Sequence, residues 1–225
     1  MSDKKIKKIG VLTSGGDAPG MNAAVRGVVR CALSSGMEVA GILRGYQGIL
    51  AEDIIPMNHR SVSGIIDRGG TILKTARCQD FRTEEGQKKA VENLKKNNID
   101  ALVVIGGDGS YQGANALWTK FQFPVIGMPG TIDNDLNGTD QTIGCFTAVH
   151  TALEAIDKIR DTAHSMERIF VIEVMGNKSG YIAAEVALGS GAEDVIVPER
   201  KFNYEEMNKK IKEGHALGKV SWMVI

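Results

Sequence analysis

Short apolar runs alternate along the chain with longer segments in which apolar residues recur every three or four positions. The recurring positions predict helices over residues 21–34, 83–97, 110–120, 142–163, 179–188 and 203–216. The short runs predict strands over residues 6–13, 38–43, 100–105, 124–128, 168–174, 195–197 and 220–225. Strands that alternate with helices in this way indicate an α/β fold with a mostly parallel sheet.

Glycine-rich turns separate several of these strands from the segments that follow. Glycine supplies 27 of the 225 residues, and it clusters at 15–16, 69–70 and 106–109. In a parallel sheet the carboxyl ends of the strands lie at one edge, where doubly wound α/β proteins bind their ligands. The sequence therefore predicts a ligand site built from these turns.

The composition limits the classes of partner. Lys and Arg together number 27, as do Asp and Glu, which gives a formal net charge of zero. A strong attraction to nucleic-acid phosphates is therefore not expected. The apolar runs are far shorter than the roughly 20 residues that span a bilayer, and the charged N-terminus lacks the apolar core of a signal peptide. We expect a cytoplasmic protein with no nucleic-acid or membrane partner.

The cysteines, Cys31, Cys78 and Cys145, form no C-x-x-C pair. Their odd number argues against a disulfide framework or a structural zinc site. We expect reduced thiols that are buried or half-buried.

The apolar face predicted for the helix over 21–34 consists of Ala23, Ala24, Val28 and Cys31.

Loop 13–20, with the sequence TSGGDAPG, joins the first predicted strand to the first predicted helix. Gly15 and Gly16 allow backbone N–H groups to approach a phosphate, and the start of the following helix favours an anion. The loop matches neither the G-x-G-x-x-G pattern nor the Walker A pattern. A phosphate-binding loop and a tight structural turn both fit these residues.

Loop 106–110, with the sequence GGDGS, directly follows the most apolar strand. Asp108 offers a carboxylate among backbone donors, which suits a Mg²⁺ ion that is shared with nucleotide phosphates. The alternative is that Asp108 only caps the helix predicted from residue 110.

Loop 129–135, with the sequence PGTIDND, again follows a strand and places Asp133 and Asp135 beside Thr131. One carboxylate can accept the proton of an attacking alcohol, while the other helps to hold water or a metal ion near the transferring phosphoryl group. The alternative is an ordinary Asp/Asn turn. Because loops of this kind are expected together at one sheet edge, the sequence favours phosphoryl transfer.

The ordered set TSGGDAPGMNAA, GYQGI, RGGTILKTAR, IGGDGSYQGA, PGTIDND and EVMG resembles the bacterial ATP-dependent 6-phosphofructokinases, over essentially the whole chain. The resemblance implies two Rossmann-like three-layer α/β/α domains with mostly parallel sheets. It implies transfer of the γ-phosphoryl group of ATP to the 1-hydroxyl of fructose 6-phosphate in glycolysis, with Mg²⁺ as cofactor. It also implies a homotetramer with shared active sites.

The resemblance assigns roles to individual residues as well. Asp133 would be the base that takes the hydroxyl proton, supported by Thr131 and Asp135. Arg168 would reach fructose 6-phosphate in the neighbouring subunit, and Asp108 would hold Mg²⁺. The ATP-binding positions would be Gly16, Arg77, Cys78, Gly107, Asp108, Gly109 and Ser110. The sugar-phosphate positions would be Thr131, Ile132, Asp133, Arg168, Met175, Gly176 and Asn177.

An effector site for ADP or phosphoenolpyruvate is implied too, at Arg26, Arg30, Arg160, Gly191, Glu193 and Lys219. Two further positions that are basic in the family are His59 and Leu217 here, so we expect a weak or altered response to these effectors. Asn177 stands where the family has arginine, next to Lys178, which removes a charge near the phosphate groups. Gly109 and Gly130 favour ATP, because pyrophosphate-dependent relatives carry Asp and Lys at these positions.

The loop over 138–141 predicts the boundary between an ATP-binding domain, residues 1–138, and part of a fructose 6-phosphate-binding domain, residues 139–225. Because the chain ends on an apolar run that would lie in a sheet, we expect the second domain to be incomplete and turnover of the chain as given to be weak or absent. Three alternatives stay open: a kinase with another acceptor, a pyrophosphate-dependent variant, and a non-catalytic or regulatory nucleotide-binding relative.

Overall fold

A computed structural model describes residues 5–218 and 221–225. The chain forms two units. Unit 1 comprises residues up to Thr131 together with Leu136–Gly144, and unit 2 comprises Ile132–Asp135 together with Cys145–Ile225. The boundary predicted after residue 138 lies within Leu136–Gly144, which is a segment of unit 1.

Unit 1 is built on a six-stranded sheet in the order β3-β2-β1-β4-β5-β6. All neighbouring strands are parallel except β2 and β3, which are antiparallel. This arrangement confirms the predicted α/β class with a mostly parallel sheet. The strands are β1 (Lys8–Ser14), β2 (Glu38–Ile42), β3 (Ile54–Met57), β4 (Ala101–Gly106), β5 (Val125–Thr131) and β6 (Ile143–Gly144).

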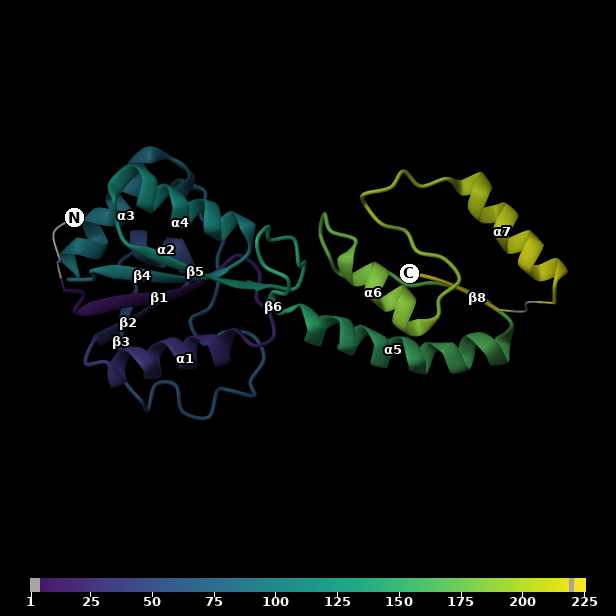
Figure 1. Ribbon diagram of the computed structural model, residues 1–225, viewed down its shortest axis with the longest axis horizontal. Coiled ribbons are helices and arrows are strands. Elements are labelled where there is room, and N and C mark those ends of the chain that lie inside the picture. The colour runs from purple at the N-terminus through teal and green to yellow at the C-terminus, as the bar shows by residue number, and fades with distance from the viewer. Residues whose placement is uncertain (1–4, 219–220) are drawn as a thin grey trace. The chain divides into compact units, whose positions relative to one another are not determined.

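Helices cover both faces of this sheet (Figure 1). On one face lies α1 (Met21–Ser34), and on the other lie α2 (Gly45–Leu50), α3 (Glu84–Lys96) and α4 (Asp108–Phe121). The main hydrophobic core lies between the sheet and α2–α4, where Leu12, Leu102 and Leu117 are fully buried. Because helices pack on both faces, β4 is apolar almost throughout.

Helix α1 buries a different side from the one predicted. Met21, Val25 and Val29 are fully buried against the sheet, whereas Cys31 is exposed. The prediction that Cys31 lies on the buried face was therefore wrong. Apolar residues occur on more than one side of this helix, and the short side chains of Ala23 and Ala24 do not decide which side faces the sheet.

The sequence pattern missed several short elements, among them α2 and β3, and misplaced others. Helix α2 has only six residues, among them Gly45 and Gly48, which lower its helix propensity. Strand β3 pairs antiparallel at the edge of the sheet and contains Pro56. The strand predicted over 195–197 was wrong: those residues are irregular, and a single bridge joins Asp194 to Val224. Helix α4 begins at Asp108 rather than at residue 110.

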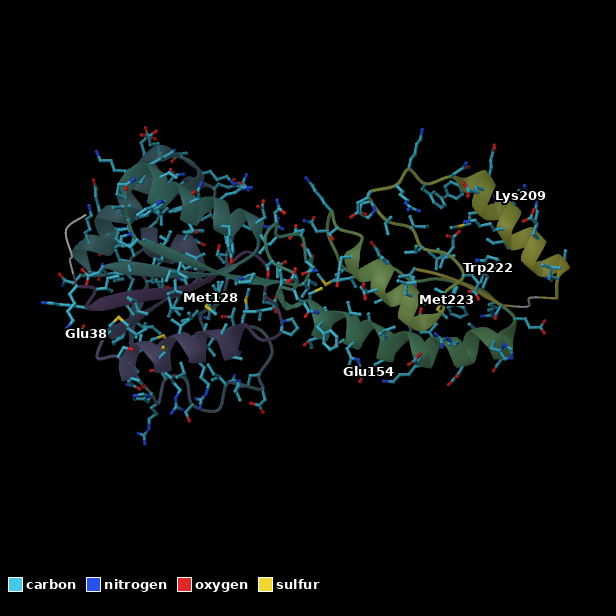
Figure 2. All side chains as sticks on the ribbon, viewed as in Figure 1. Glu38, Met128, Glu154, Lys209, Trp222 and Met223 are labelled. Carbon is cyan, nitrogen blue, oxygen red and sulfur yellow. The ribbon has the colours of Figure 1, made fainter. Side chains whose placement is uncertain are left out.

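Unit 2 contains a two-stranded parallel sheet, formed by β7 (Ile169–Val171) and β8 (Trp222–Val224). Its helices are α5 (Cys145–Met166), α6 (Tyr181–Ser190) and α7 (Tyr204–Ala216). Ile156 of α5, Val186 of α6 and Met223 of β8 share one core cluster, and Figure 2 shows Met223 beside α6. Within residues 5–218 and 221–225, no helix is both long and apolar enough to cross a membrane.

The substitution Gly48→Ala tests how closely α2 packs against the chain that precedes it. A Cβ at Gly48 would lie 1.7 Å from the carbonyl oxygen of Leu43, whereas a Cβ at Gly27 of α1 meets no atom within 4 Å. We expect G48A to lower the free energy of unfolding by about 2 kcal/mol or more, because the backbone must shift. We expect the control G27A to raise it by roughly 0.5–1 kcal/mol, because alanine loses less backbone entropy in a helix. Urea unfolding followed by circular dichroism measures both, and equal effects would contradict this packing.

Candidate active site

The carboxyl ends of three neighbouring parallel strands lie together at one edge of unit 1. Strand β4 pairs with β1 on one side and with β5 on the other. A Cβ at Gly106 would lie 2.5 Å from both the carbonyl oxygen of Ser14 and Oγ of Ser110, and a Cβ at Gly107 would lie 3.4 Å from Cβ of Thr131. The structure therefore brings together loop 13–20, loop 106–110 and the end of β5.

Two glycines of loop 13–20, Gly15 and Gly16, are exposed. Gly15 is exposed and has a φ of 88°, which glycine adopts without strain. Gly16 is exposed as well, and a Cβ there would meet no atom within 4 Å. Helix α1 then begins after Gly20, which offers no capping side chain. Open backbone and an uncapped helix start are what an anion-binding loop requires.

Asp108 is the first residue of α4, and its side chain is exposed. Its Oδ2 accepts a hydrogen bond from Nε2 of Gln112 at 2.6 Å, and the residue in the capping position is Gly107. Among the described residues, no three His, Cys, Asp or Glu side chains form a group that could hold a metal ion. A divalent ion at Asp108 would therefore take most of its oxygen ligands from phosphate groups and water, as Mg²⁺ commonly does.

Tyr46 of α2 supports the first turn of α4. Its hydroxyl donates a hydrogen bond to the carbonyl oxygen of Ser110 at 2.6 Å, and burial raises the pKa of Tyr46, so the hydroxyl keeps its proton. The ring stacks on Phe81 with the centroids 4.0 Å apart, and Cys78 packs against the same core cluster. A Cβ at Gly113 would lie 2.8 Å from the Tyr46 ring. The local sequence pattern around Tyr46 gave no sign of this role.

Loop 68–77 is hydrogen-bonded to β1 near the same edge of the sheet. Thr13, in β1, donates a hydrogen bond from Oγ1 to the carbonyl oxygen of Lys74 at 2.9 Å. Arg77, three residues later, is exposed, and Cys78 is half-buried. This hydrogen bond holds loop 68–77 against β1, the strand that leads into loop 13–20.

Asp133 belongs to unit 2, where Ile132 packs against the core cluster. Asp133 is half-buried, and burial raises its pKa, with the negative charge of Asp135 adding to the increase. Asp135 itself is exposed. A carboxylate whose pKa is raised is a better proton acceptor than an ordinary aspartate, and a partly buried one is suited to general-base chemistry.

Four more of the residues expected at the sugar phosphate, Arg168, Met175, Gly176 and Asn177, lie in unit 2, whereas Thr131 lies in unit 1. Arg168 precedes β7 and is exposed, and the side chain of Met175 is 74% exposed. A Cβ at Gly176 would lie 2.4 Å from the carbonyl oxygen of Ser179, so the turn has no room for a side chain there. Asn177 follows with a φ of 55°, a conformation that asparagine tolerates better than most residues.

Part of the predicted effector site surrounds a cavity of about 680 Å³ in unit 2, which is lined by Arg160, Gly191, Glu193 and, among others, His164 and Trp222. This volume lies within the usual range for small-ligand pockets. The Arg160 guanidinium donates to the carbonyl oxygen of Ser190, and Oε2 of Glu193 accepts from the Met223 backbone at 2.5 Å.

The remaining effector residues are distributed differently. Arg26 and Arg30 lie on α1 of unit 1, where Arg26 donates to the carbonyl oxygen of Val62 at 2.5 Å. His59 is exposed, and so is Leu217. Lys219 lies outside the described residues.

The two glycines expected to favour ATP have different surroundings. A Cβ at Gly130 would lie 2.9 Å from Cγ2 of Ile105 and 3.2 Å from Cε of Met21, so core packing alone accounts for glycine there. A Cβ at Gly109 would meet no atom within 4 Å.

Comparison with known proteins identifies the relatives of this chain. Residues 8–225 match the family model described as phosphofructokinase. An ATP-dependent 6-phosphofructokinase of Shouchella clausii is 56% identical over 220 residues, which cover 98% of this chain and 69% of that protein. One from Actinobacillus pleuropneumoniae serotype 5b is 55% identical over 216 residues, which cover 96% of this chain and 67% of that protein.

Solved structures give the same result. A phosphofructokinase from Saccharomyces cerevisiae superposes with a TM-score of 0.86 at 38% identity, covering 97% of this chain and 33% of that one. A pyrophosphate-dependent phosphofructokinase from Marinobacter aquaeolei superposes with a TM-score of 0.78 at 25% identity, covering 97% of this chain and 59% of that one. The chain thus spans about a third of the yeast protein and about two thirds of the bacterial ATP-dependent relatives.

The burial of Asp133 predicts that D133N changes stability in a pH-dependent way. A carboxyl with a higher pKa in the folded state than in the unfolded state loses stability as the pH rises through that folded pKa. Because D133N removes the ionisation, we expect its melting temperature at pH 8 to exceed that of the wild type. The difference should vanish below the ordinary aspartate value of 3.8, where both forms are neutral.

Thermal unfolding at a series of pH values measures this effect. The control D135N removes the neighbouring charge but leaves Asp133 ionisable, so it should move the pH dependence of Asp133 downward without abolishing it. A D133N variant that melts below the wild type at pH 8 would show that burial of the charge is not unfavourable.

Proposed function

Because this chain belongs to the phosphofructokinase family, we propose that the protein transfers the γ-phosphoryl group of ATP to the 1-hydroxyl of fructose 6-phosphate, a reaction of glycolysis. The products are fructose 1,6-bisphosphate and ADP. The observation that carries the proposal is the contact of the two glycine-rich loops with each other and with Thr131, two residues before Asp133. The bacterial relatives named as ATP-dependent enzymes support the choice of donor.

The nucleotide half of the site would lie in the proposed ATP-binding domain, residues 1–138. Open backbone at Gly16, Gly107 and Gly109 can donate N–H groups to phosphates, and Arg77 supplies a fixed positive charge. Cys78 and Ser110 complete this set. Asp108 would hold Mg²⁺, which offsets phosphate charge during phosphoryl transfer.

Asp133 would take the proton of the 1-hydroxyl. Its raised pKa favours proton acceptance, and Asp135 contributes to that increase. The transition state of phosphoryl transfer is loose, so the proton moves late and correct placement of the hydroxyl matters more than base strength. Thr131 and Ile132 precede the base in the chain and would help to position the sugar.

Residues 139–225 would form part of the acceptor domain. Arg168, Met175, Gly176 and Asn177 would contact fructose 6-phosphate, with Arg168 acting on the substrate of a neighbouring subunit in a cytoplasmic homotetramer. Asn177 is neutral, so it would bind the phosphate by hydrogen bonds from its amide rather than by charge.

The cavity of unit 2 supports an effector site. Arg160 offers positive charge, Glu193 offers a metal ligand and Gly191 leaves the rim open, which fits a phosphorylated effector such as ADP or phosphoenolpyruvate. By resemblance to the family, Arg26, Arg30 and Lys219 would also belong to the effector set. His59 and Leu217 stand at positions where further basic residues would be needed, so the response to either effector would be weak.

Replacing the proposed base gives the most direct test of the reaction. We expect D133S to lower kcat by about 10²- to 10⁴-fold while leaving the affinity for Mg–ATP within about twofold, since a general base acts in the transition state. A coupled assay with ATP and fructose 6-phosphate, together with calorimetric titration of Mg–ATP, measures both quantities. Equal losses of binding and turnover would indicate a structural role for Asp133.

A pyrophosphate-dependent reaction is the second candidate, because one relative with the same fold carries that name. We expect G109D to weaken ATP use by at least about tenfold, since a carboxylate there would crowd and repel the α-phosphate. The control G109A adds a Cβ that meets no atom within 4 Å, so it should retain most ATP activity. If G109D and the wild type had the same ATP kinetics, Gly109 would not select the donor. Wild-type turnover with pyrophosphate but not with ATP would favour the second candidate.

A further inference from the structure

Loop 68–77 is irregular, and side-chain hydrogen bonds help the fully buried Leu73 to hold it in place. One set of these hydrogen bonds is made by Asn22, which is 1% exposed on the buried side of α1. Its Nδ2 donates to the carbonyl oxygens of Arg68 and Gly69 at 2.9 and 3.2 Å. Its Oδ1 accepts from the backbone of Ile72 at 2.8 Å. One amide side chain thus fixes the first half of the loop.

The second half is fixed by a directed chain of hydrogen bonds that passes through Thr13, which is fully buried. Oγ1 of Thr13 lies 2.9 Å from the carbonyl oxygen of Lys74 and 2.9 Å from Oγ1 of Thr71. A hydroxyl has a single proton, and a carbonyl can only accept. Thr13 therefore donates to Lys74, and Thr71 donates to Thr13. Thr71 in turn accepts from the backbone of Leu73 at 3.2 Å.

The chain of hydrogen bonds ends at a strained residue. Lys74 has a φ of 58°, a left-handed conformation that costs a lysine roughly 1–2 kcal/mol. Its carbonyl is held by Thr13, and the preceding carbonyl, of Leu73, accepts from the backbone of Arg44 at 2.8 Å. Without the Thr13 hydroxyl, the backbone at Lys74 would relax toward a less strained conformation. That change would carry Arg77, three residues later, away from its place.

We propose that Thr13 is a positioning residue: through Thr71 and Lys74 it holds loop 68–77 against β1 and thereby keeps Arg77 at the phosphates of ATP. The inference rests on the proposed role of Arg77. Thr13 acts through the loop because it is buried, while Arg77 is exposed. The strain at Lys74 makes the hydroxyl necessary, since the loop has a more relaxed conformation available without it.

A matched pair of variants at Thr13 isolates the hydroxyl. Valine has nearly the shape of threonine without the hydroxyl, and serine keeps the hydroxyl without the methyl group. We expect T13V to raise the dissociation constant for Mg–ATP by about 5- to 20-fold and T13S to change it by less than about twofold. Should T13V fail to fold, T71V breaks the same chain at a half-buried position and should weaken Mg–ATP in the same direction. Wild-type affinity in T13V or T71V would overturn the proposal.

A double-mutant cycle tests whether the effect passes through Arg77. In an R77A background, T13V should weaken Mg–ATP by less than about twofold, because the cation that the loop positions is already absent. A full additional loss in that background would show that Thr13 acts on ATP by another route, and it would overturn the proposal.

Alkylation of Cys78 gives a readout that does not depend on ATP. Cys78 follows Arg77 directly and is half-buried, and the substitution C31S removes the exposed thiol on α1. In that background T13V should speed the reaction of Cys78 with iodoacetamide by at least about fivefold, while T13S should not. If T13V left the labelling rate of Cys78 unchanged, Thr13 would not hold loop 68–77, and the proposal would be overturned. A wild-type protein that failed to bind Mg–ATP but showed this labelling pattern would refute only the proposed function.

Discussion

The absence of a side chain at Gly106 allows the ends of β1 and β4 to meet. Any Cβ there would lie 2.5 Å from the backbone of Ser14 and from the Ser110 side chain. Because those two residues lie in loop 13–20 and loop 106–110, a side chain would separate the two loops. Neighbouring parallel strands bring loops to one edge in many α/β proteins, but contact between the loops depends on this local lack of bulk.

Buried polar side chains hold the loops around the sheet in place through hydrogen bonds to the loop backbone. Thr13, Asn22 and Tyr46 are all buried, and each donates to a backbone carbonyl in a segment that contributes to the site. A buried hydroxyl or amide that lost its partner would be costly, so each loop is confined to positions that satisfy these groups. Tyr46 thereby holds the backbone two residues after Asp108, and Thr13 holds the loop that leads to Arg77.

The longer strands and helices of unit 1, and the convergence of its loops at one edge, could be predicted from the sequence because apolar runs and glycine turns are local signals. The buried polar contacts could not. The backbone partners of Asn22, Thr13 and Tyr46 lie 46, 61 and 64 residues away along the chain. A local pattern shows a polar residue within an apolar segment, but it does not show which distant backbone group satisfies it. The same limit explains the wrong face of α1, since apolar residues on several sides do not reveal where the sheet lies.

Gly109 and Gly130 are both glycine, but for different physical reasons. Ile105 and Met21 occupy the space beside Gly130, so glycine is required there by packing whatever the phosphoryl donor is. Space beside Gly109 is open, so packing would admit a side chain and does not explain the glycine. Gly109 lies at the start of α4 beside Asp108. Because packing does not determine the residue type there, the size of the phosphoryl donor can determine it. Under the proposed function, selection between ATP and a smaller donor would act at Gly109, whereas packing alone accounts for glycine at position 130.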